Sequence, residues 1–519
     1  MDVVYICLEV IILSDLICGY ELDDFQKEIV LNDSKHVLVV AGAGSGKTLT
    51  ILGKINYLIK YLDVKEEEII CISFTNKACD SLMKKLNDMG YNVSVYTFHK
   101  LSLEILSVNN YHYDICDDNL LDSICNDFFS YDVVDYPHFM KYVMNYFNYS
   151  YNKNIKDDYL VFLRKYYYKL NILKRNMVTF LKLFKCNGFV LSDFISFYNR
   201  LKTGKYGRFR KEKFFLIFCI NIYIKYTDYM SLNNLIDFDD MIITATECVV
   251  KNGVKNSIKY IIIDEYQDTS YIRFCLINEI IKRTSCNLLV VGDDFQSIYK
   301  FSGCCLDLFL NFEDYFNDCK VLKLENTYRN SQALIDLAGS FVMKNKKQIK
   351  KRLVSNKRME SPIRIVYYND VVNDFKNLIE EVYDEFKSPI MILGRNNDDI
   401  NMVIDESFSF DEDKVIYSNN EDIEMYYLTV HKAKGLEEDV VIVINLDDRY
   451  LGFPNKINED KILGLVSISN ETYPFAEERR LFYVAVTRTR GCCYLFSSKR
   501  KPSVFVKEIE KMIKKKRLS

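Results

Sequence analysis

Short runs of apolar residues recur along the chain, and polar or glycine-rich segments follow many of them. These runs are too short for ordinary helices and are typical of strands buried on both faces of a sheet. Between several of them, apolar residues are spaced three or four apart, as from Leu49 to Leu62, which predicts amphipathic helices. The expected strands are His36–Val40, Ile69–Ser73, Tyr260–Asp264, Leu288–Gly292, Pro389–Leu393 and Val440–Ile444.

Strands that alternate with helices indicate parallel sheets covered by helices, so the predicted fold class is α/β. The expected strands fall into two groups, and a chain of 519 residues is too long for one ordinary core. We therefore expect two such domains. The first comprises residues 21–103 plus 237–310, and the second comprises residues 311–519.

Residues 104–236 interrupt the first group of strands and read as a mostly helical insertion rich in Tyr, Phe, Asn and Lys. Residues 111–140 hold seven aspartates and no lysine or arginine, whereas residues 141–215 have a net charge of +13. Aromatic residues are interleaved with the basic ones. Such a segment is either a solvated face or a surface that contacts nucleic-acid phosphates and bases, and the sequence favours neither.

The overall composition is that of an ordinary protein of the cytoplasm. The net charge is −3, and the 16 cysteines include no CxxC pair, so free thiols are expected rather than a disulfide scaffold or a zinc site. The apolar N-terminus carries Glu9 and is too short to span a bilayer. We expect an accessory helix over residues 1–20, no membrane span, and a soluble, cytoplasmic protein.

The strongest chemical signal lies between an expected strand and an expected helix. Glycines in such a turn let backbone N–H groups surround phosphates at the N-terminus of the helix. Lys47 is then placed for the β- and γ-phosphates of a nucleotide, and the hydroxyl of Thr48 for Mg²⁺. The loop consists of Ala41, Gly42, Ala43, Gly44, Ser45, Gly46, Lys47 and Thr48.

An acidic pair follows a second buried strand. Phosphoryl transfer to water requires one carboxylate to hold Mg²⁺ and another to orient or deprotonate the attacking water. Asp264 fits the first role and Glu265 the second. Alone the pair is a weak signal, but together with the phosphate loop it predicts a nucleoside triphosphatase.

Further segments resemble the conserved motifs of UvrD/Rep/PcrA-type helicases of superfamily 1. They occur in the family's order and, with the segment around Gln26, extend over residues 26–490. The similar segments are Phe74–Ala78, Thr97–His99, Ile236–Asp240, Asp264–Thr269, Gly292–Gly303, Tyr328–Arg329, Leu393–Asn396, Thr429–Glu437 and Glu477–Arg488.

This resemblance implies two RecA-like motor domains, 1A and 2A, with residues 104–236 as a 1B insertion. Only 33 residues separate Arg395 from Thr429, where longer relatives insert a 2B subdomain. We therefore expect 2B to be absent or a stub near residues 398–428. The motif wording is closest to that of helicase IV, whose long N-terminal region has no counterpart in this sequence.

The resemblance also implies roles for residues around ATP. Gln26 would read the adenine edge, Tyr328 would stack on the adenine, and Glu437 would hydrogen-bond the ribose. Arg329 and Arg488 would reach the γ-phosphate from the second domain. Gln296 would sense the γ-phosphate and connect it with the DNA-binding face.

For DNA, the resemblance implies that Phe74, Tyr299 and Phe301 stack on bases, although core packing is an alternative for all three. The family usually has tryptophan at the position of Phe301, and this chain has none, so weaker stacking is expected. Further expected nucleic-acid contacts are Thr75, Thr97, His99, Arg395 and His431.

The function implied is an ATP- and Mg²⁺-dependent 3′–5′ helicase or translocase on single-stranded DNA. Its substrates would include DNA with a 3′ single-stranded tail, and its partners could include repair or replication proteins. The alternative is a related ATPase that remodels a protein–nucleic acid complex such as RNA polymerase. Because 2B is reduced or absent, translocation is a firmer expectation than processive unwinding.

Overall fold

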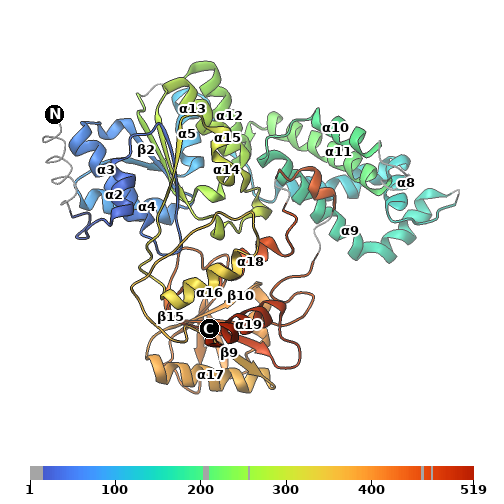
Figure 1. Ribbon diagram of the computed structural model, residues 1–519. Coiled ribbons are helices and arrows are strands. Elements are labelled where there is room, and N and C mark those ends of the chain that lie inside the picture. Colours follow the sequence, from blue (N-terminus) through green and yellow to red (C-terminus); the bar gives the residue numbers. More distant parts are fainter. Residues whose placement is uncertain are drawn as a thin grey trace.

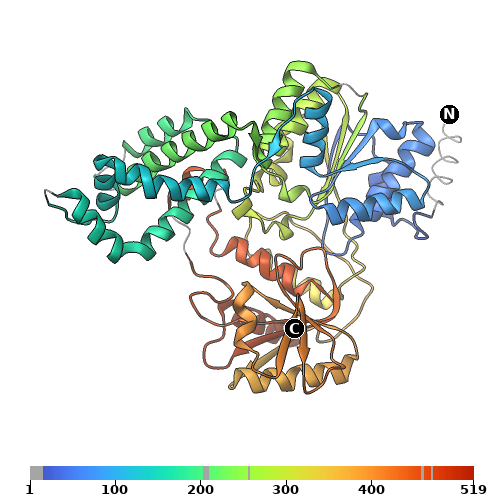
Figure 2. The same ribbon diagram turned by 180° about the vertical axis from the view of Figure 1, so that it is seen from behind.

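The computed structural model describes residues 16–518 except 153, 203–209, 255–256, 458–460 and 469–470. Its three parts are two α/β domains, one above the other in Figure 1, and a helical insertion that projects sideways from the upper, N-terminal domain. The view from behind shows the same arrangement (Figure 2). Among the described residues, no helix has the length and apolar character needed to cross a membrane.

A six-stranded, fully parallel sheet forms the centre of the first domain, in the order β3-β2-β6-β7-β1-β8. This order brings the phosphate-loop strand β1 and the acidic strand β6 to either side of β7, with their carboxyl ends at one edge. The strands are β1 His36–Val40, β2 Ile69–Ile72, β3 Ser94–Tyr96, β6 Tyr260–Ile263, β7 Asn287–Gly292 and β8 Cys319–Lys323.

Helices cover both faces of this sheet because its strands are apolar on both sides. Val37 and Val39 belong to one buried cluster and Leu38 and Val40 to another, as the alternation of side chains along a strand requires. The main helices of the domain are α2 Asp24–Leu31, α3 Lys47–Leu62, α4 Asn76–Asp88, α5 Phe98–Val108, α12 Phe238–Asn252 and α13 Tyr271–Thr284.

The second domain is built on a seven-stranded sheet in the order β11-β12-β13-β10-β14-β15-β9. Its strands are parallel except at the β11–β12 and β12–β13 pairs. They are β9 Ile363–Tyr368, β10 Ile390–Gly394, β11 Phe408–Asp411, β12 Lys414–Tyr417, β13 Met425–Thr429, β14 Glu438–Val443 and β15 Thr489–Ser498.

Two layers of helices enclose the second sheet. Helices α16 (Gln332–Val342), α18 (Ala476–Val486) and α19 (Val504–Leu518) pack on one face, and α17 (Val371–Phe386) packs on the other. Figure 1 shows α16 and α18 between the two sheets and α17 at the far side. Both domains are thus RecA-like α/β layers, and the predicted fold class is confirmed.

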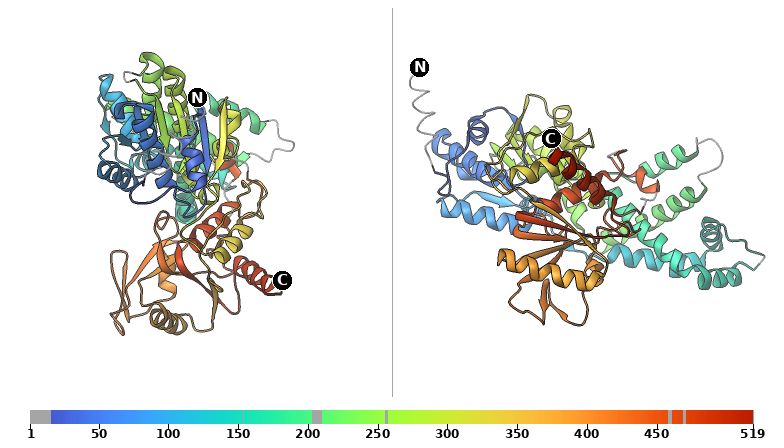
Figure 3. Two further views of the ribbon diagram at one scale, coloured as in Figure 1. Left: turned by 60° about the vertical axis from the view of Figure 1, so that its left-hand side comes forward. Right: turned by 60° about the horizontal axis from the view of Figure 1, so that its bottom comes forward.

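The insertion is almost entirely helical. The parallel strands β4 (Asp114–Ile115) and β5 (Leu235–Ile236) join its two ends. Between them lie α6 (Leu120–Asp127), α8 (Pro137–Tyr146), α9 (Ile155–Cys186), α10 (Asp193–Lys202) and α11 (Arg210–Leu232), together with the short helical segments η2 (Phe128–Asp132) and α7 (Val133–Asp135). Figure 3 shows how far the insertion extends beyond the two sheets.

The structure places two domain limits differently from the expectation. Strand β8 pairs with β1, so the first domain continues past the expected limit at residue 310, and the expected start of the insertion at 104 falls inside α5. Residues 398–428 form a short 3₁₀ segment, the β11–β12 hairpin and most of β13, which extend the second sheet rather than a separate 2B unit. The helix expected over residues 1–20 falls mainly on residues 1–15, outside the described part of the chain.

A segment of the second domain also reaches the insertion. The 3₁₀ segment η7 (Lys461–Leu465) packs against α9, and the side chain of Asn187 donates a hydrogen bond of 2.7 Å to the carbonyl of Val466. Leu183, Phe301 and Leu463 line a small pocket where the insertion and both domains meet. The insertion is thus in contact with both domains.

Candidate functional site: the interdomain nucleotide cleft

The phosphate loop joins β1 to the N-terminus of α3, as the sequence predicts. Gly44 and Gly46 adopt positive φ angles of 70° and 79°, in the region that favours glycine. A Cβ on Gly44 would lie 2.4 Å from the Cβ of Arg329 in the second domain. Glycine at this position therefore permits both the turn and the close approach of that arginine.

Lys47 and the acidic pair meet at the carboxyl end of the sheet. The Nζ of Lys47 lies 2.5 Å from Oε1 of Glu265, and the side-chain amide of Gln267 donates a 2.5 Å hydrogen bond to Oε2. Burial disfavours ionisation of Glu265, but Lys47 and Lys434 outweigh it and hold its pKa at about 2. Burial and the Glu265 charge raise the pKa of Asp264 to about 6. The two adjacent carboxylates thus have different protonation behaviour.

Gln26 presents an unpaired amide nitrogen beside the phosphate loop. Its Oε1 accepts a 2.9 Å hydrogen bond from the N–H of Asp23, whereas its fully buried Nε2 has no hydrogen-bond partner. A Cβ on Gly46 would lie 2.6 Å from this nitrogen. Buried polar groups are nearly always paired, so this orphaned donor fits a ligand acceptor such as an adenine nitrogen.

The segment leading into the second domain crosses directly over the phosphate loop. The hydroxyl of Thr327 donates to the Ala43 carbonyl across 2.6 Å, and the N–H of Tyr328 donates to the Gly44 carbonyl across 2.9 Å. The Tyr328 ring is half exposed, and its hydroxyl donates a 2.5 Å hydrogen bond to Asp23. Tyr328 and Gln26 therefore lie on the same side of the loop, where a base would sit.

Two arginines of the second domain reach the cleft. Arg329 donates from Nε to the Glu437 carboxylate across 2.5 Å, so the residue expected at the ribose is here paired with an arginine. Arg488 is 1% exposed, and it donates hydrogen bonds to the carbonyls of Val484 and Leu436, to Oε1 of Gln296 and to the hydroxyl oxygen of Thr487. Burial and the nearby Arg329 lower the pKa of Arg488 to about 9.

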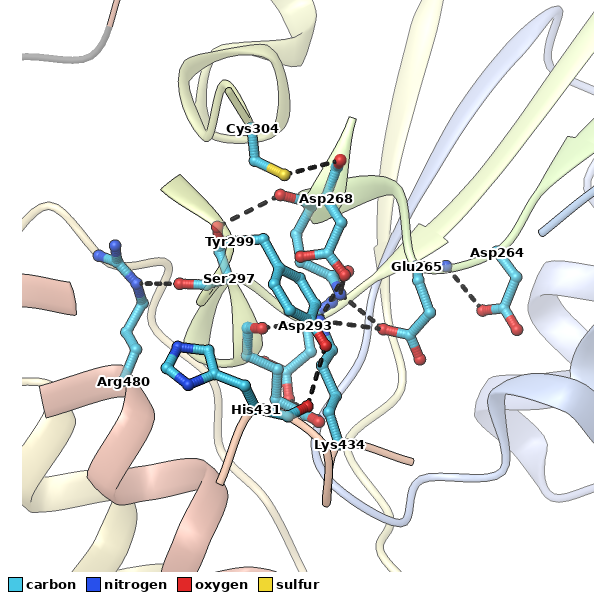
Figure 4. Close-up of polar contacts among 12 residues, drawn as sticks. Asp264, Glu265, Asp268, Asp293, Ser297, Tyr299, Cys304, His431, Lys434 and Arg480 are labelled. Atoms are coloured by element: carbon cyan, nitrogen blue, oxygen red, sulfur yellow. Dashed lines mark hydrogen bonds and ion pairs between the residues drawn. The ribbon is translucent and has the colours of Figure 1, made fainter. Parts of the chain in front are cut away.

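Gln296 lies at the centre of a buried network between the domains, and Figure 4 shows part of that network, including the contact between Arg480 and Ser297. Its Nε2 donates to Asp293 across 2.6 Å, its Oε1 accepts from Arg488 across 3.2 Å, and its backbone carbonyl accepts from Lys434 across 2.8 Å. Lys434 also pairs with the buried Asp268. The carbonyl of Ser297 accepts a 2.6 Å hydrogen bond from Arg480 of α18. Several groups of the second domain thus hold one short segment of the first.

One aromatic cluster combines residues from both domains. The hydroxyl of Tyr299 donates to the carbonyl of His431 across 3.0 Å, and the Phe301 ring is 5.5 Å from the His431 ring. Phe301 is 61% exposed and is therefore accessible to a base. Arg395, another expected DNA contact, forms an ion pair with Glu478 at 2.8 Å. Burial and Arg395 lower the pKa of His431 to about 4, so its ring is neutral near pH 7.

A second aromatic cluster lies on the first domain alone. The Phe74 ring packs edge-on against Phe98 at 5.8 Å, and the guanidinium of Arg273 lies 4.9 Å from the Phe74 ring. His99 lies 4.9 Å from the Phe238 ring, and burial with Arg273 lowers its pKa to about 4. Phe74 is only partly exposed, so it is less available to a base than Phe301.

The hydroxyls of Thr75 and Thr97 have local roles in the structure. Thr75 accepts a hydrogen bond of 3.1 Å from the N–H of Ala78, and Thr97 accepts one of 3.3 Å from the N–H of Lys100. Each threonine is therefore the N-cap of the helix that follows, α4 or α5. A strand contact by either residue remains a prediction.

The donor set around the acidic pair is suitable for Mg²⁺, which prefers carboxylate and hydroxyl oxygens. Thr48 is the second residue of α3, and Asp264 directly follows β6. The carboxylate of Asp264 accepts a 2.8 Å hydrogen bond from the N–H of Glu265. Glu265 is paired with Lys47, whereas no ion pair is found for Asp264 among the described residues. A metal ion held by Asp264 and Thr48 stays a prediction.

Sequence reasoning missed several residues of this site. Three of them, Lys434, Asp293 and Arg480, lie inside segments that resemble helicase motifs. The resemblance pointed to these segments but assigned no role to these residues. Arg273 and Lys351 lie outside those segments. Only the fold brings Arg273 to Phe74 and Lys351 to Asp293.

Comparison with known proteins agrees with this geometry. The family described as UvrD/REP helicase N-terminal domain matches residues 22–317, which is more than half of the chain. The chain belongs to the UvrD/Rep helicase family. The family described as UvrD-like helicase C-terminal domain matches residues 370–500. The first domain, the insertion and the second domain can therefore be called 1A, 1B and 2A.

Individual relatives are distant and mostly longer. The chain is 29% identical over 367 residues to "ATP-dependent DNA helicase Rep" of Buchnera aphidicola subsp. Schizaphis graminum, covering 68% of this chain and 49% of the relative. It is 26% identical over 513 residues to "Probable DNA helicase" of Mycoplasma pneumoniae, covering 94% of this chain and 87% of the relative. It is 24% identical over 506 residues to "DNA helicase IV" of Escherichia coli, covering 95% of this chain and 70% of the relative. The chain thus spans about half the length of the Rep protein that it matches.

Proposed function

We propose that this protein is an ATP-dependent DNA helicase or translocase that moves 3′–5′ along single-stranded DNA. The observation that carries the proposal is the position of Arg488. This cation is buried, lies near a second arginine, and has no carboxylate partner among the described residues. An anion between the domains would relieve that arrangement, and the γ-phosphate of ATP would reach it from the adjoining phosphate loop.

Bound ATP would replace contacts that residues lining the cleft make with one another, such as the pair of Lys47 and Glu265. The phosphates would take Lys47 from Glu265, leaving Glu265 free to orient the attacking water. Gln26 and Tyr328 would hold the adenine, and Arg329 with Arg488 would stabilise charge on the transferred phosphoryl group. Thr48 and Asp264 would hold Mg²⁺, which when bound neutralises phosphate charge.

Hydrolysis would change the contact between the domains and thereby the grip on DNA. Closure depends on Arg329 and Arg488 finding the γ-phosphate, so loss of that group favours reopening. Gln296 lies three residues before Tyr299 and five before Phe301, and it contacts Arg488 directly. This short connection supports a mechanical link between the nucleotide and the strand.

The exposed face of α9 is the best candidate for an additional nucleic-acid surface. Tyr167 and Tyr168 are 67% and 77% exposed, and Arg164, Lys165 and Lys169 are exposed around them. Aromatic faces with neighbouring cations suit the bases and phosphates of a nucleic acid. Lys174, in contrast, contacts Asn126 and lies over the Phe129 ring within the insertion.

An ATPase assay with and without single-stranded DNA tests the proposal. We expect the strand to stimulate hydrolysis, because ATP and strand would share the Gln296–Phe301 segment. An RNA strand of the same sequence is the matched competitor. Hydrolysis that no strand stimulates would contradict the proposed motor.

A further inference from the structure

A short segment of domain 2A lies back across the phosphate loop of domain 1A. Residues 349–354 follow α16, and the N–H of Val354 donates to the Glu325 carbonyl across 2.7 Å. Leu353 covers Gly42 so closely that a Cβ there would lie 2.6 Å from its Cδ2. The segment is therefore packed against the loop that would bind the phosphates.

Lys351 extends from this segment into a fully buried acidic site. Its side chain is 2% exposed, and its Nζ pairs with Asp293 and lies 2.5 Å from Oδ1 of Asp294. The same nitrogen donates to the carbonyl of Ala41 across 3.0 Å and lies 3.9 Å from the centre of the Phe295 ring. One cation thus contacts the first residue of the phosphate loop and both aspartates after β7.

The two aspartates are inaccessible to solvent and need this cation. Asp293 accepts hydrogen bonds from the N–H of Phe295 and from Nε2 of Gln296, and Asp294 accepts one of 2.9 Å from the N–H of Ile349. Buried carboxylates without a counter-charge are strongly unfavourable. Loss of Lys351 would therefore favour reorientation of Asp293.

The orientation of Gln296 depends on Asp293. An amide presents a donor on one side and an acceptor on the other, and the Asp293 side chain accepts from both Phe295 and Gln296. It therefore selects the amide orientation in which Nε2 faces Asp293 and Oε1 faces Arg488. A displaced Asp293 would no longer enforce that orientation.

We propose that Lys351 is a positioning residue for ATP hydrolysis, acting through Asp293 on Gln296. This inference rests on the proposed ATPase function. Lys351 contacts neither the arginines nor the acidic pair in the described interactions, so its effect on turnover would be indirect. A purely structural ion pair would instead affect folding without acting through Gln296.

A double-mutant cycle separates these possibilities. We expect Lys351→Met to lower kcat about tenfold or more while the KM for ATP changes about twofold or less, because the lysine orients groups without binding the base. In a Gln296→Ala background the same change should lower kcat by less than about threefold, because the residue through which it acts is already absent. Lys350→Met, at the exposed neighbouring position, is the matched control and should behave as wild type.

Melting curves accompany each variant. If Lys351→Met does not fold, Lys351→Met/Asp294→Asn replaces it, since this variant removes one buried negative charge together with the cation. Under our proposal the double variant folds but keeps the low kcat. Recovery of wild-type kcat would assign Lys351 a structural role only and would overturn the proposal.

Two other results would also overturn it. One is an unchanged kcat in a folded Lys351 variant. The other is a decrease in kcat on Lys351→Met that is as large in the Gln296→Ala background as in the wild type. Failure of the proposed function gives a different result. In that case the wild-type protein itself does not hydrolyse ATP.

Discussion

Arg488 of domain 2A donates a hydrogen bond from Nη2 to Oε1 of Gln296 in domain 1A, across 3.2 Å. This contact joins the buried arginine, which has no carboxylate partner among the described residues, to the segment that continues into Tyr299 and Phe301. Hydrolysis and strand binding would therefore communicate through one side-chain amide.

Changing Glu265 to Gln should abolish ATP turnover while leaving nucleotide binding intact. The amide keeps the shape of the side chain but cannot activate water as a carboxylate does. Binding of a fluorescent ATP analogue and single-turnover hydrolysis measure the two effects separately. Lys47→Ala should weaken binding as well, and wild-type turnover by Glu265→Gln would show that another group orients the water.

Arg329→Ala and Arg488→Ala should each lower kcat by about a thousandfold, because each guanidinium would stabilise charge that develops on the transferred phosphoryl group. Circular dichroism melting provides the folding control. Arg283, which pairs on the surface with Glu279, offers a comparison arginine whose loss should leave kcat near wild type. Normal hydrolysis by both cleft variants would refute the interdomain site.

The Mg²⁺ requirement should increase as the pH falls below about 6. Burial and Glu265 raise the pKa of Asp264 to about 6, so the metal-free carboxylate becomes protonated below that value. Protonation competes with the metal, and the Mg²⁺ concentration for half-maximal ATPase should rise toward about tenfold per pH unit. Titrations between about pH 5 and 8 measure this dependence. A constant requirement through this range would mean that Asp264 does not hold the ion.

Gln26→Ala should reduce the preference for ATP over GTP about fivefold, the value of one hydrogen bond. The orphaned Nε2 is the group that would contact the adenine. Comparing kcat/KM for the two nucleotides isolates base recognition from phosphate chemistry. An equal loss with ATP and GTP would instead indicate damage to the phosphate loop.

Reversing the charges of Arg164, Lys165, Lys169 and Arg175 on α9 should weaken binding to single-stranded DNA. Each lost phosphate contact should also flatten the salt dependence by about 0.7 in log–log slope. Lys499, Arg500, Lys514 and Lys515, which are exposed on domain 2A, supply a control variant with the same change in net charge. DNA-independent ATP hydrolysis should be normal in both, and an unchanged slope in the α9 variant would make this face a solvated one.

Buried strands could be predicted from short apolar runs, but an edge strand could not. The run His36–Val40 is a strand with those limits, because all five side chains are buried between helices. Strand β8 (Cys319–Lys323) was missed because it lies at a sheet edge and mixes exposed lysines with apolar residues. Its place beside β1 depends on pairing with a residue range almost 300 positions earlier.

The candidate site divides in a similar way. Lys47, Asp264 and Glu265 could be predicted because strand ends and a glycine turn place them together. Lys351 could not be, because its contact with Asp293 depends on how a segment of 2A packs across 1A. Contacts between segments that are distant in the chain produce no periodic pattern of residues, so a single sequence does not reveal them.

Displacement of streptavidin from biotinylated single-stranded DNA tests the central claim most directly. A motor that moves 3′–5′ should displace streptavidin from the 5′ end in an ATP-dependent reaction and much more slowly from the 3′ end. The Glu265→Gln variant should displace it from neither. Absence of displacement from both ends by the wild-type protein, or faster release at the 3′ end, would contradict the account.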